Sequence, residues 1–213
     1  MSKLILFQGD SITDCGRSRD NDGYLGCGYP RLVQSSLGLD APGEYRFINR
    51  GISGNRIVDV YARIKTDIIN LKPDYMSIYI GVNDVWHELG SQNGVATPKF
   101  EKIYSMLLDE VKEACPDIKI FLIAPFVLKG GGTYNAEDTS YYEAFVRDVN
   151  EKIEAVKRLG EKYDLPVIEL QPAFDEALKS AKDSYWTADG VHPTAMGHEL
   201  IKRLWLDTFE KIK

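Results

Sequence analysis

A serine, a histidine and an aspartate occur in this sequence within strings that are suited to nucleophilic catalysis. Ser11 lies in GDSIT, and His192 follows Asp189 by three residues in DGVHP. A serine hydroxyl is a weak nucleophile near neutral pH, whereas a histidine has the pKa needed to remove its proton during attack. A carboxylate on the other ring nitrogen fixes the tautomer of that imidazole. The pattern therefore predicts acyl transfer from an ester, with Ser11 as nucleophile, His192 as general base and Asp189 as its orienting partner.

The attack would create a negatively charged oxygen, and this oxygen needs hydrogen-bond donors that are already in place. The candidates are the backbone N–H groups of Ser11 and Gly54 and the side-chain amide of Asn83, from the strings GDSIT, RGISGN and GVND. In acyl-transfer enzymes each such donor lowers the barrier by about 2.7–4 kcal/mol. Glycine at position 54 permits a positive φ and the close approach of a ligand. We expect these three groups to form an oxyanion hole.

Alternating strand and helix signals predict how these strings are positioned. Short apolar or β-rich runs predict strands at residues 4–8, 45–49, 75–80, 118–124 and 166–170. Helical periodicity occupies residues 100–111, 142–156 and 201–209. Thr97 and Pro98 are expected to be the cap and the first residue of the first of these helices. This alternation favours an α/β fold, a doubly wound parallel sheet with helices on both faces. Reactive groups of such sheets gather at the carboxyl ends of the strands, so the strings that follow strands should meet on one rim.

Length and charge restrict the class of partner. The chain has 213 residues, which suits a single domain spanning residues 1–213, and it shows neither a repeat nor a low-complexity tract. Its formal charge of −6 disfavours nucleic acid and an anionic membrane surface, because both bind clustered cations. A neutral or weakly polar small molecule is the expected substrate.

Cysteine usage and the start of the chain suggest a compartment. Cys15, Cys27 and Cys115 form no CxxC pair, which favours neither a disulfide framework nor a thiolate metal site and is typical of a reducing compartment. The opening MSKLILFQGDS lacks the longer apolar core and small-residue cleavage site of a signal peptide, and no stretch approaches the roughly 18 apolar residues of a membrane span. We therefore expect a cytoplasmic protein.

Each candidate residue also has a purely structural interpretation. Ser11 could cap a helix, and Gly54, Asn83 and Asp84 could simply form turns. His192 precedes a predicted helix and could be an exposed loop residue. Two other imidazoles compete for the role of base: His87 has Asp84 three residues before it, whereas His198 falls within the last predicted helix.

Further side chains lie close to these strings. Asp10 and Asp14 could suggest metal or phosphoryl chemistry, but no matching motif accompanies them, so we expect no metal and no cofactor and interpret Asp10 as an organiser of its loop. Trp86 and Trp186 flank the candidate residues and could wall a pocket with flat aromatic faces, although packing in the core or at a subunit contact explains them equally well. Asp10, Trp86 and Trp186 are therefore the candidate substrate-binding residues.

Four blocks together resemble a known family. GDSIT, the glycine of ISGN, GVND and DGVHP are similar, in that order, to the sequence blocks of the SGNH (GDSL-type) hydrolases, and the similarity spans nearly the whole chain. The resemblance implies a flavodoxin-like three-layer sandwich with a five-stranded parallel sheet, hydrolysis by a serine without a metal, and an oxyanion hole. The GxSxG elbow of α/β-hydrolases is absent, because Thr13 stands where its second glycine would be.

Longer strings narrow the resemblance. GDSITDCGR, GISGN, SIYIGVNDVW and DGVHP followed by GH are similar to intracellular acetylxylan esterases of that family. This implies a small acetylated saccharide as substrate, deacetylated through an acyl-enzyme, and a homo-oligomer to which Tyr134, Tyr141 and Tyr142 could contribute a contact. The alternatives are a lysophospholipase or thioesterase of the same family, and a non-catalytic flavodoxin-like binding module.

Overall fold

One parallel sheet forms the centre of the molecule. The structure is a computed structural model and describes residues 2–213. Its five strands pair in the order β2-β1-β3-β4-β5, and every pair is parallel. The strands are β1 (Lys3–Gly9), β2 (Tyr45–Asn49), β3 (Tyr75–Tyr79), β4 (Lys119–Ala124) and β5 (Val167–Glu169). The chain runs outward from β1 to β2 and returns past β1 to β3, so the winding direction reverses between β1 and β3.

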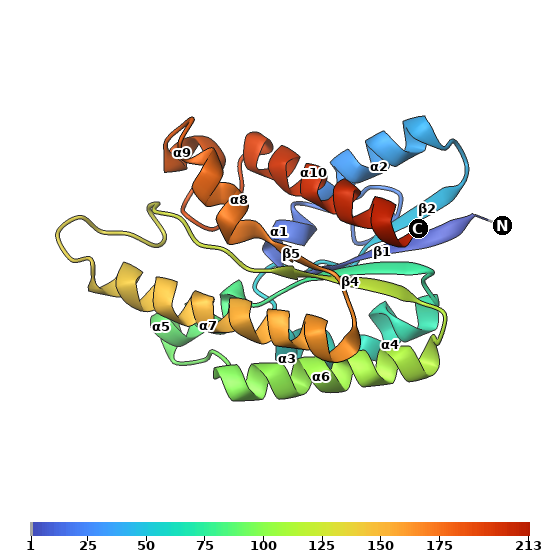
Figure 1. The fold of residues 1–213 in the computed structure, drawn as a ribbon, viewed down its shortest axis with the longest axis horizontal. Helices are drawn as coiled ribbons and strands as arrows, with labels where there is room; N and C mark the ends of the chain where they lie inside the picture. The colour runs from blue at the N-terminus through green and yellow to red at the C-terminus, as the bar shows by residue number, and fades with distance from the viewer. Residues whose placement is uncertain (1) are drawn as a thin grey trace.

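Helices cover both faces of this sheet. In Figure 1, α2, α8, α9 and α10 lie on one side and the helices from α3 to α7 lie on the other. The helices are α1 (Ser11–Asp14), α2 (Tyr29–Asp40), α3 (Ile57–Ala62), α4 (Ile64–Asp67), α5 (Val82–Ser91), α6 (Thr97–Ala114), α7 (Ser140–Tyr163), α8 (Leu170–Ala177), α9 (Asp183–Trp186) and α10 (Ala195–Ile212), with a 3-10 turn, η1 (Ile69–Leu71). Helices α2 and α10 contact each other, as do α6 and α7. None of the helices in residues 2–213 is long and apolar enough to cross a membrane.

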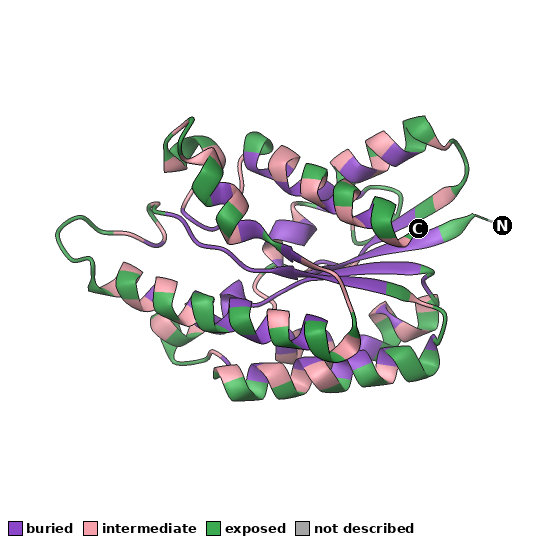
Figure 2. Ribbon diagram, in the orientation of Figure 1, coloured by how far each residue is buried: buried purple, intermediate pink, exposed green. Residues whose placement is uncertain are grey.

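Burial follows from this layering. All five residues of β3 are buried, because helices cover it on both faces, and Figure 2 shows the inner strands as buried along almost their whole length. On α10, Trp205 packs against Phe7 of β1 and Phe121 of β4, with ring centroids 5.4 and 5.2 Å apart. The expected α/β fold with a five-stranded parallel sheet and helices on both faces is thereby confirmed.

Two boundary predictions were wrong in detail. The last strand is shorter than expected, because Leu170 already begins α8. Thr97 is the first residue of α6 rather than its cap, since the preceding Ala96 takes the cap position. The Thr97 hydroxyl is engaged elsewhere: it donates to Glu151 and accepts from the Lys152 ammonium, each at 2.8 Å. These bonds to α7 replace the local bond that a cap would make.

Candidate active site

The turn after β1 presents Ser11. Strand β1 ends at Gly9, Asp10 takes the N-cap position, and Ser11 is the first residue of α1. The Asp10 carboxylate accepts a hydrogen bond from the Ile12 N–H at 3.0 Å, which fixes the turn. Ser11 is half-buried and stands where the winding of the sheet reverses, the usual ligand position of open parallel sheets.

Ser11, His192 and Asp189 form a chain of hydrogen bonds. The Ser11 Oγ lies 2.8 Å from the His192 Nε2, and the His192 Nδ1 lies 2.7 Å from the Asp189 Oδ2. An ionised carboxylate only accepts hydrogen bonds, so the proton of the neutral imidazole belongs on Nδ1. The lone pair of Nε2 then faces the Ser11 hydroxyl, as removal of the serine proton requires.

Hydrogen bonds keep the Asp189 side chain ionised. Burial opposes its ionisation, but hydrogen bonds from the His192 ring and from the N–H groups of His192 and Val191 outweigh that cost and lower its pKa to about 2. The hydrogen bond with Asp189 raises the pKa of His192 above its usual value, against the opposing effect of burial. Asp189 therefore stabilises the imidazolium that forms when His192 takes up a proton.

The loop at residues 128–133, after β4, holds the Asp189–His192 turn in place. The Gly132 N–H donates to the Asp189 carbonyl, and the Leu128 N–H donates to the Gly190 carbonyl, at 2.9 and 2.8 Å. Gly190 has a φ of +101°, and a Cβ there would approach the Thr133 hydroxyl to 2.2 Å. Only glycine fits this position, which places His192 within reach of Ser11.

The two other predicted donors lie in neighbouring loops. Gly54 follows β2 and has a φ of +80°, and a Cβ there would meet nothing within 4 Å, so conformation rather than space calls for glycine. The buried Asn83 is the second residue of α5, the helix that follows β3, and its Nδ2 donates to the Asn55 carbonyl at 3.1 Å. Asn83 therefore contacts the residue that follows Gly54 and keeps a second amide proton for another acceptor.

Asp10 lies beneath this site and does not line it. Its side chain is fully buried, and burial raises its pKa to about 7, against the hydrogen bond from Ile12. Asp84 resembles it: burial raises the pKa of this carboxyl to about 8, and both oxygens accept from the Ile57 N–H. The position of Asp10 fits the interpretation as a loop organiser, whereas its burial keeps the carboxylate away from any ligand at the surface.

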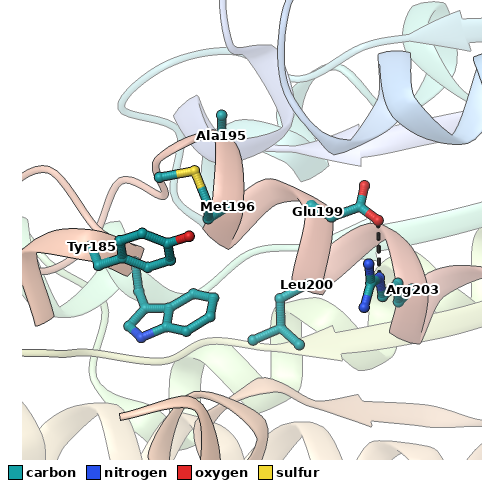
Figure 3. A pocket seen from close by; sticks show the side chains of 7 residues that line it. Tyr185, Ala195, Met196, Glu199, Leu200 and Arg203 are labelled. Carbon is teal, nitrogen blue, oxygen red and sulfur yellow. Dashed lines mark hydrogen bonds and ion pairs between the residues drawn. The ribbon is translucent and has the colours of Figure 1, made fainter. Parts of the chain in front are cut away.

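The two flanking tryptophans have different surroundings. The Trp86 ring lies 5.8 Å from the His192 ring, centroid to centroid, so it borders the imidazole. Trp186 donates through its Nε1 to the Ala181 carbonyl and lines a pocket of about 420 Å³ between α9 and α10. Tyr185, Met196 and Leu200 face this pocket in Figure 3, and none of its lining residues belongs to the Ser11 chain of hydrogen bonds.

The competing imidazoles make other contacts. His87 is half-buried on α5, and Asp84, three residues before it, directs its carboxylate to Ile57 instead. His198 lies on α10, as expected, where its Nδ1 accepts from the Tyr29 N–H at 3.1 Å and burial lowers its pKa to about 4. Among the histidines, His192 has the hydrogen bond to Ser11.

Sequence reasoning missed a set of polar contacts between α1 and the loop after β2. The Asp14 carboxylate accepts from the N–H and hydroxyl of Ser53 and from Arg19. In the sequence, the pair Asp10 and Asp14 suggests only metal or phosphoryl chemistry, for which no motif is present. Within residues 2–213, no group of three acidic, histidine or cysteine side chains is arranged to hold a metal ion. Asp14 and Ser53 are 39 residues apart, and no local sequence pattern predicts that they pair.

Comparison with known proteins adds independent information. A model of the GDSL-like lipase/acylhydrolase family matches residues 7–200. An acetylxylan esterase from Geobacillus stearothermophilus is 35% identical over 212 residues, covering 95% of this chain and 91% of that protein.

Solved structures of similar sequence have the same fold. The crystal structure of Axe2, an acetylxylan esterase from Geobacillus stearothermophilus, superposes with a TM-score of 0.84 at 34% identity, covering 97% of this chain and 93% of that one. Variants of Axe2 that replace a serine, an aspartate or a histidine by alanine are described as catalytic mutants. A protein from Parabacteroides merdae described as GDSL-like gives a TM-score of 0.89 at 33% identity, covering 99% and 97% of the two chains. This chain belongs to the GDSL-like lipase/acylhydrolase family and is a carboxylic ester hydrolase.

Proposed function

We propose that this protein removes acetyl groups from acetylated xylo-oligosaccharides or related small sugars, with Ser11 as the nucleophile. The observation that carries the proposal is the chain of hydrogen bonds from Ser11 through His192 to Asp189. The substrate class rests on the 35% identity to an acetylxylan esterase over nearly the full length of both proteins.

The reaction proceeds in two halves. Ser11 Oγ attacks the ester carbonyl carbon while His192 Nε2 takes up the hydroxyl proton, and a tetrahedral oxyanion forms. His192 then returns the proton to the departing sugar oxygen, which leaves the acetyl group on Ser11. A water molecule, deprotonated by His192, attacks the acetyl-serine, and acetate departs as Ser11 recovers its proton.

The remaining residues stabilise the charges that form during these steps and contact the substrate. Asp189 keeps the His192 ring in the tautomer that accepts at Nε2 and offsets the charge of the imidazolium. The N–H groups of Ser11 and Gly54 and the amide of Asn83 donate to the oxyanion. Trp86 offers an apolar face beside His192 for the acetyl group or the sugar ring.

The direct test replaces Ser11 by alanine and measures acetate release from acetylated xylo-oligosaccharides. We expect the rate to fall by several orders of magnitude, leaving only the contribution of the oxyanion donors and of substrate binding. An organophosphate should label Ser11 in the unmodified protein. Unchanged hydrolysis by the Ser11→Ala protein, or labelling of another serine, would contradict the assignment and favour a non-catalytic binding role for these loops.

Substrate class is decided in a separate assay on the same preparation. Acetate release from acetylated xylo-oligosaccharides is compared with fatty-acid release from a lysophospholipid. We expect the sugar ester to be hydrolysed with the higher kcat/KM. The opposite order would replace sugar deacetylation with a lysophospholipase activity of the same catalytic residues.

A further inference from the structure

The loop after β2 makes a tight turn just before the proposed oxyanion donor. The Asn55 N–H donates to the Ile52 carbonyl at 3.1 Å, which closes a four-residue β-turn with Ser53 and Gly54 at its centre. Gly54 has a positive φ of +80°, and Ser53 is not among the residues with positive φ. This combination defines a type II turn, in which the peptide between the two central residues is flipped relative to a type I turn. The flip decides where the Gly54 N–H points.

Contacts hold both ends of this turn, and its exit is held at Asn55, whose carbonyl accepts from Asn83 at 3.1 Å and whose side-chain oxygen accepts from Arg63 at 2.9 Å. The Arg50 and Ile52 N–H groups donate to the carbonyls of Phe7 and Gly9 at 2.8 and 3.1 Å, which continues the pairing with β1. A Cβ on Gly51 would lie 2.4 Å from the Asp14 backbone nitrogen, so the loop packs directly against α1. Both ends of the turn are therefore anchored, whereas Ser53 between them is exposed.

Asp14 supplies the contacts that Ser53 makes. Its Oδ2 accepts from the Ser53 N–H at 3.0 Å and from the Ser53 hydroxyl at 3.1 Å. The Asp14 side chain is only 6% exposed, and Arg19 neutralises it at 2.6 Å while donating to the Gly51 carbonyl at 2.9 Å. A carboxylate binds an N–H more strongly than a neutral acceptor does, so this pair of bonds restrains both the backbone and the side chain of Ser53.

We propose that Asp14 is a positioning residue for ester hydrolysis: by holding Ser53, it keeps the Ser53–Gly54 peptide in the orientation that directs the Gly54 N–H to the oxyanion. Asp14 ends the helix that begins with Ser11, so one short helix carries the nucleophile and anchors the donor loop. The distance between the attacking oxygen and one of its stabilising donors is thereby set within a single unit. This inference rests on the proposed roles of Ser11 and Gly54.

Kinetics of Asp14→Ala and Asp14→Asn on 4-nitrophenyl acetate test the inference. Without the carboxylate Ser53 loses the two bonds that restrain it, so the Ser53–Gly54 peptide can flip while the ends of the turn stay held. Misplacing one oxyanion donor in this way should lower kcat by ~10- to 100-fold while KM changes by less than about 3-fold. Asparagine retains an acceptor oxygen for Ser53, so Asp14→Asn should recover most of the lost kcat. The unfolding temperature of each variant shows whether it remains folded at the assay temperature.

The matched control is Asp22→Ala. Asp22 is exposed and pairs with Arg50 at the start of the same loop, but it does not contact Ser53. Its replacement should leave kcat within about 2-fold of the original value, since an exposed ion pair contributes little to the fold.

The outcomes separate this inference from the proposed function. A kcat for Asp14→Ala within about 3-fold of the original, a loss confined to KM, or equal losses for the alanine and asparagine variants would overturn the positioning role while Ser11→Ala remained inactive. Full activity in Ser11→Ala would overturn both. A fall in kcat that the asparagine variant reverses, with Asp22→Ala unaffected, supports the role of Asp14.

Discussion

Two aspartates flank the contact between Ser11 and His192, and their surroundings give them opposite properties. Asp189 lies in the turn before α10, has a side chain 33% exposed, and receives hydrogen bonds from the His192 ring and from two backbone N–H groups. Asp10 lies in the turn after β1, is fully buried, and receives one hydrogen bond, from Ile12. The pKa of Asp189 is lowered to about 2, and that of Asp10 is raised to about 7.

The difference shows that nearness to the imidazole does not decide which carboxylate serves it. Both charges interact with His192, but only Asp189 has enough donors to offset the loss of water. A carboxylate that stays ionised can stabilise the imidazolium throughout the reaction, whereas a buried one with a single donor is suited to holding a turn. This difference supports the proposed role of Asp189 beside His192 and that of Asp10 in holding its turn.

Removing the charge of Asp189 tests the difference between the two aspartates most directly. Asp189→Asn should lower kcat by roughly 10⁴-fold, because an asparagine amide permits the wrong imidazole tautomer and leaves the imidazolium without a counter-charge. The measurement is kcat on a soluble acetyl ester at pH 8. The same substitution at Asp10 should have a far smaller effect on kcat, and equal losses at the two positions would refute the division of roles.

Replacing Asp10 should instead change how the stability of the protein depends on pH. The folded protein holds a proton on Asp10 up to a pH of about 7, whereas the unfolded carboxyl releases it near 3.8. The folded state therefore binds more protons between these values, so this residue makes stability fall as pH rises from about 4 to 7, by as much as about 4 kcal/mol. Asp10→Asn removes this contribution, and its free energy of unfolding relative to the original protein should rise between pH 4.5 and pH 8.

Urea unfolding at the two pH values provides the measurement, and Asp22→Asn provides its control. The pKa of Asp22 is lowered by the hydrogen bond from Arg50, so the stability it contributes is present above its unfolded pKa and is lost only in more acidic solution. Its replacement should have the same effect at pH 4.5 and at pH 8. If Asp10→Asn also changes the free energy of unfolding equally at the two pH values, Asp10 is ionised in the folded protein throughout this range.

Much of the fold and of the candidate site could be predicted because local signals coincide with the topology. Each predicted strand overlaps an observed one, and the strings that carry Ser11, Gly54 and Asn83 follow β1, β2 and β3 directly. Parallel strands bring their carboxyl ends to one edge, so order along the chain was sufficient to group these residues. The contact between Ser11 and His192, 181 residues apart, needs a different argument, because DGVHP lies between α9 and α10 and follows no strand. Its prediction rested on the chemistry of a serine, a histidine and an aspartate and on the family resemblance.

What could not be predicted depends on the direction of single side chains. Trp86 and Trp186 looked equivalent in the sequence, yet one borders His192 and the other lines the pocket between α9 and α10. The role of Asp14 depends on a loop 39 residues away, and the burial of Asp10 depends on the packing of several elements around one turn. Such properties arise from tertiary packing, which neither periodicity nor spacing encodes.

The smallest expected effect concerns a pair whose spacing matches that of the proposed catalytic pair. Asp84 and His87 are separated by three residues, as are Asp189 and His192, but burial raises the pKa of Asp84 to about 8 and its carboxylate binds the Ile57 N–H. Asp84 therefore does not serve His87 as Asp189 serves His192, and the Ser11 hydroxyl bonds to His192 instead. His87→Ala should leave kcat/KM within about 2-fold of the original value, because a side chain outside the reacting groups contributes no differential stabilisation of the transition state. The pH profile of kcat/KM supplies a second readout, because its acidic limb reports the pKa of the general base. A shift of this limb in His87→Ala would identify His87 as the base, whereas an unchanged limb would agree with the proposed role of His192.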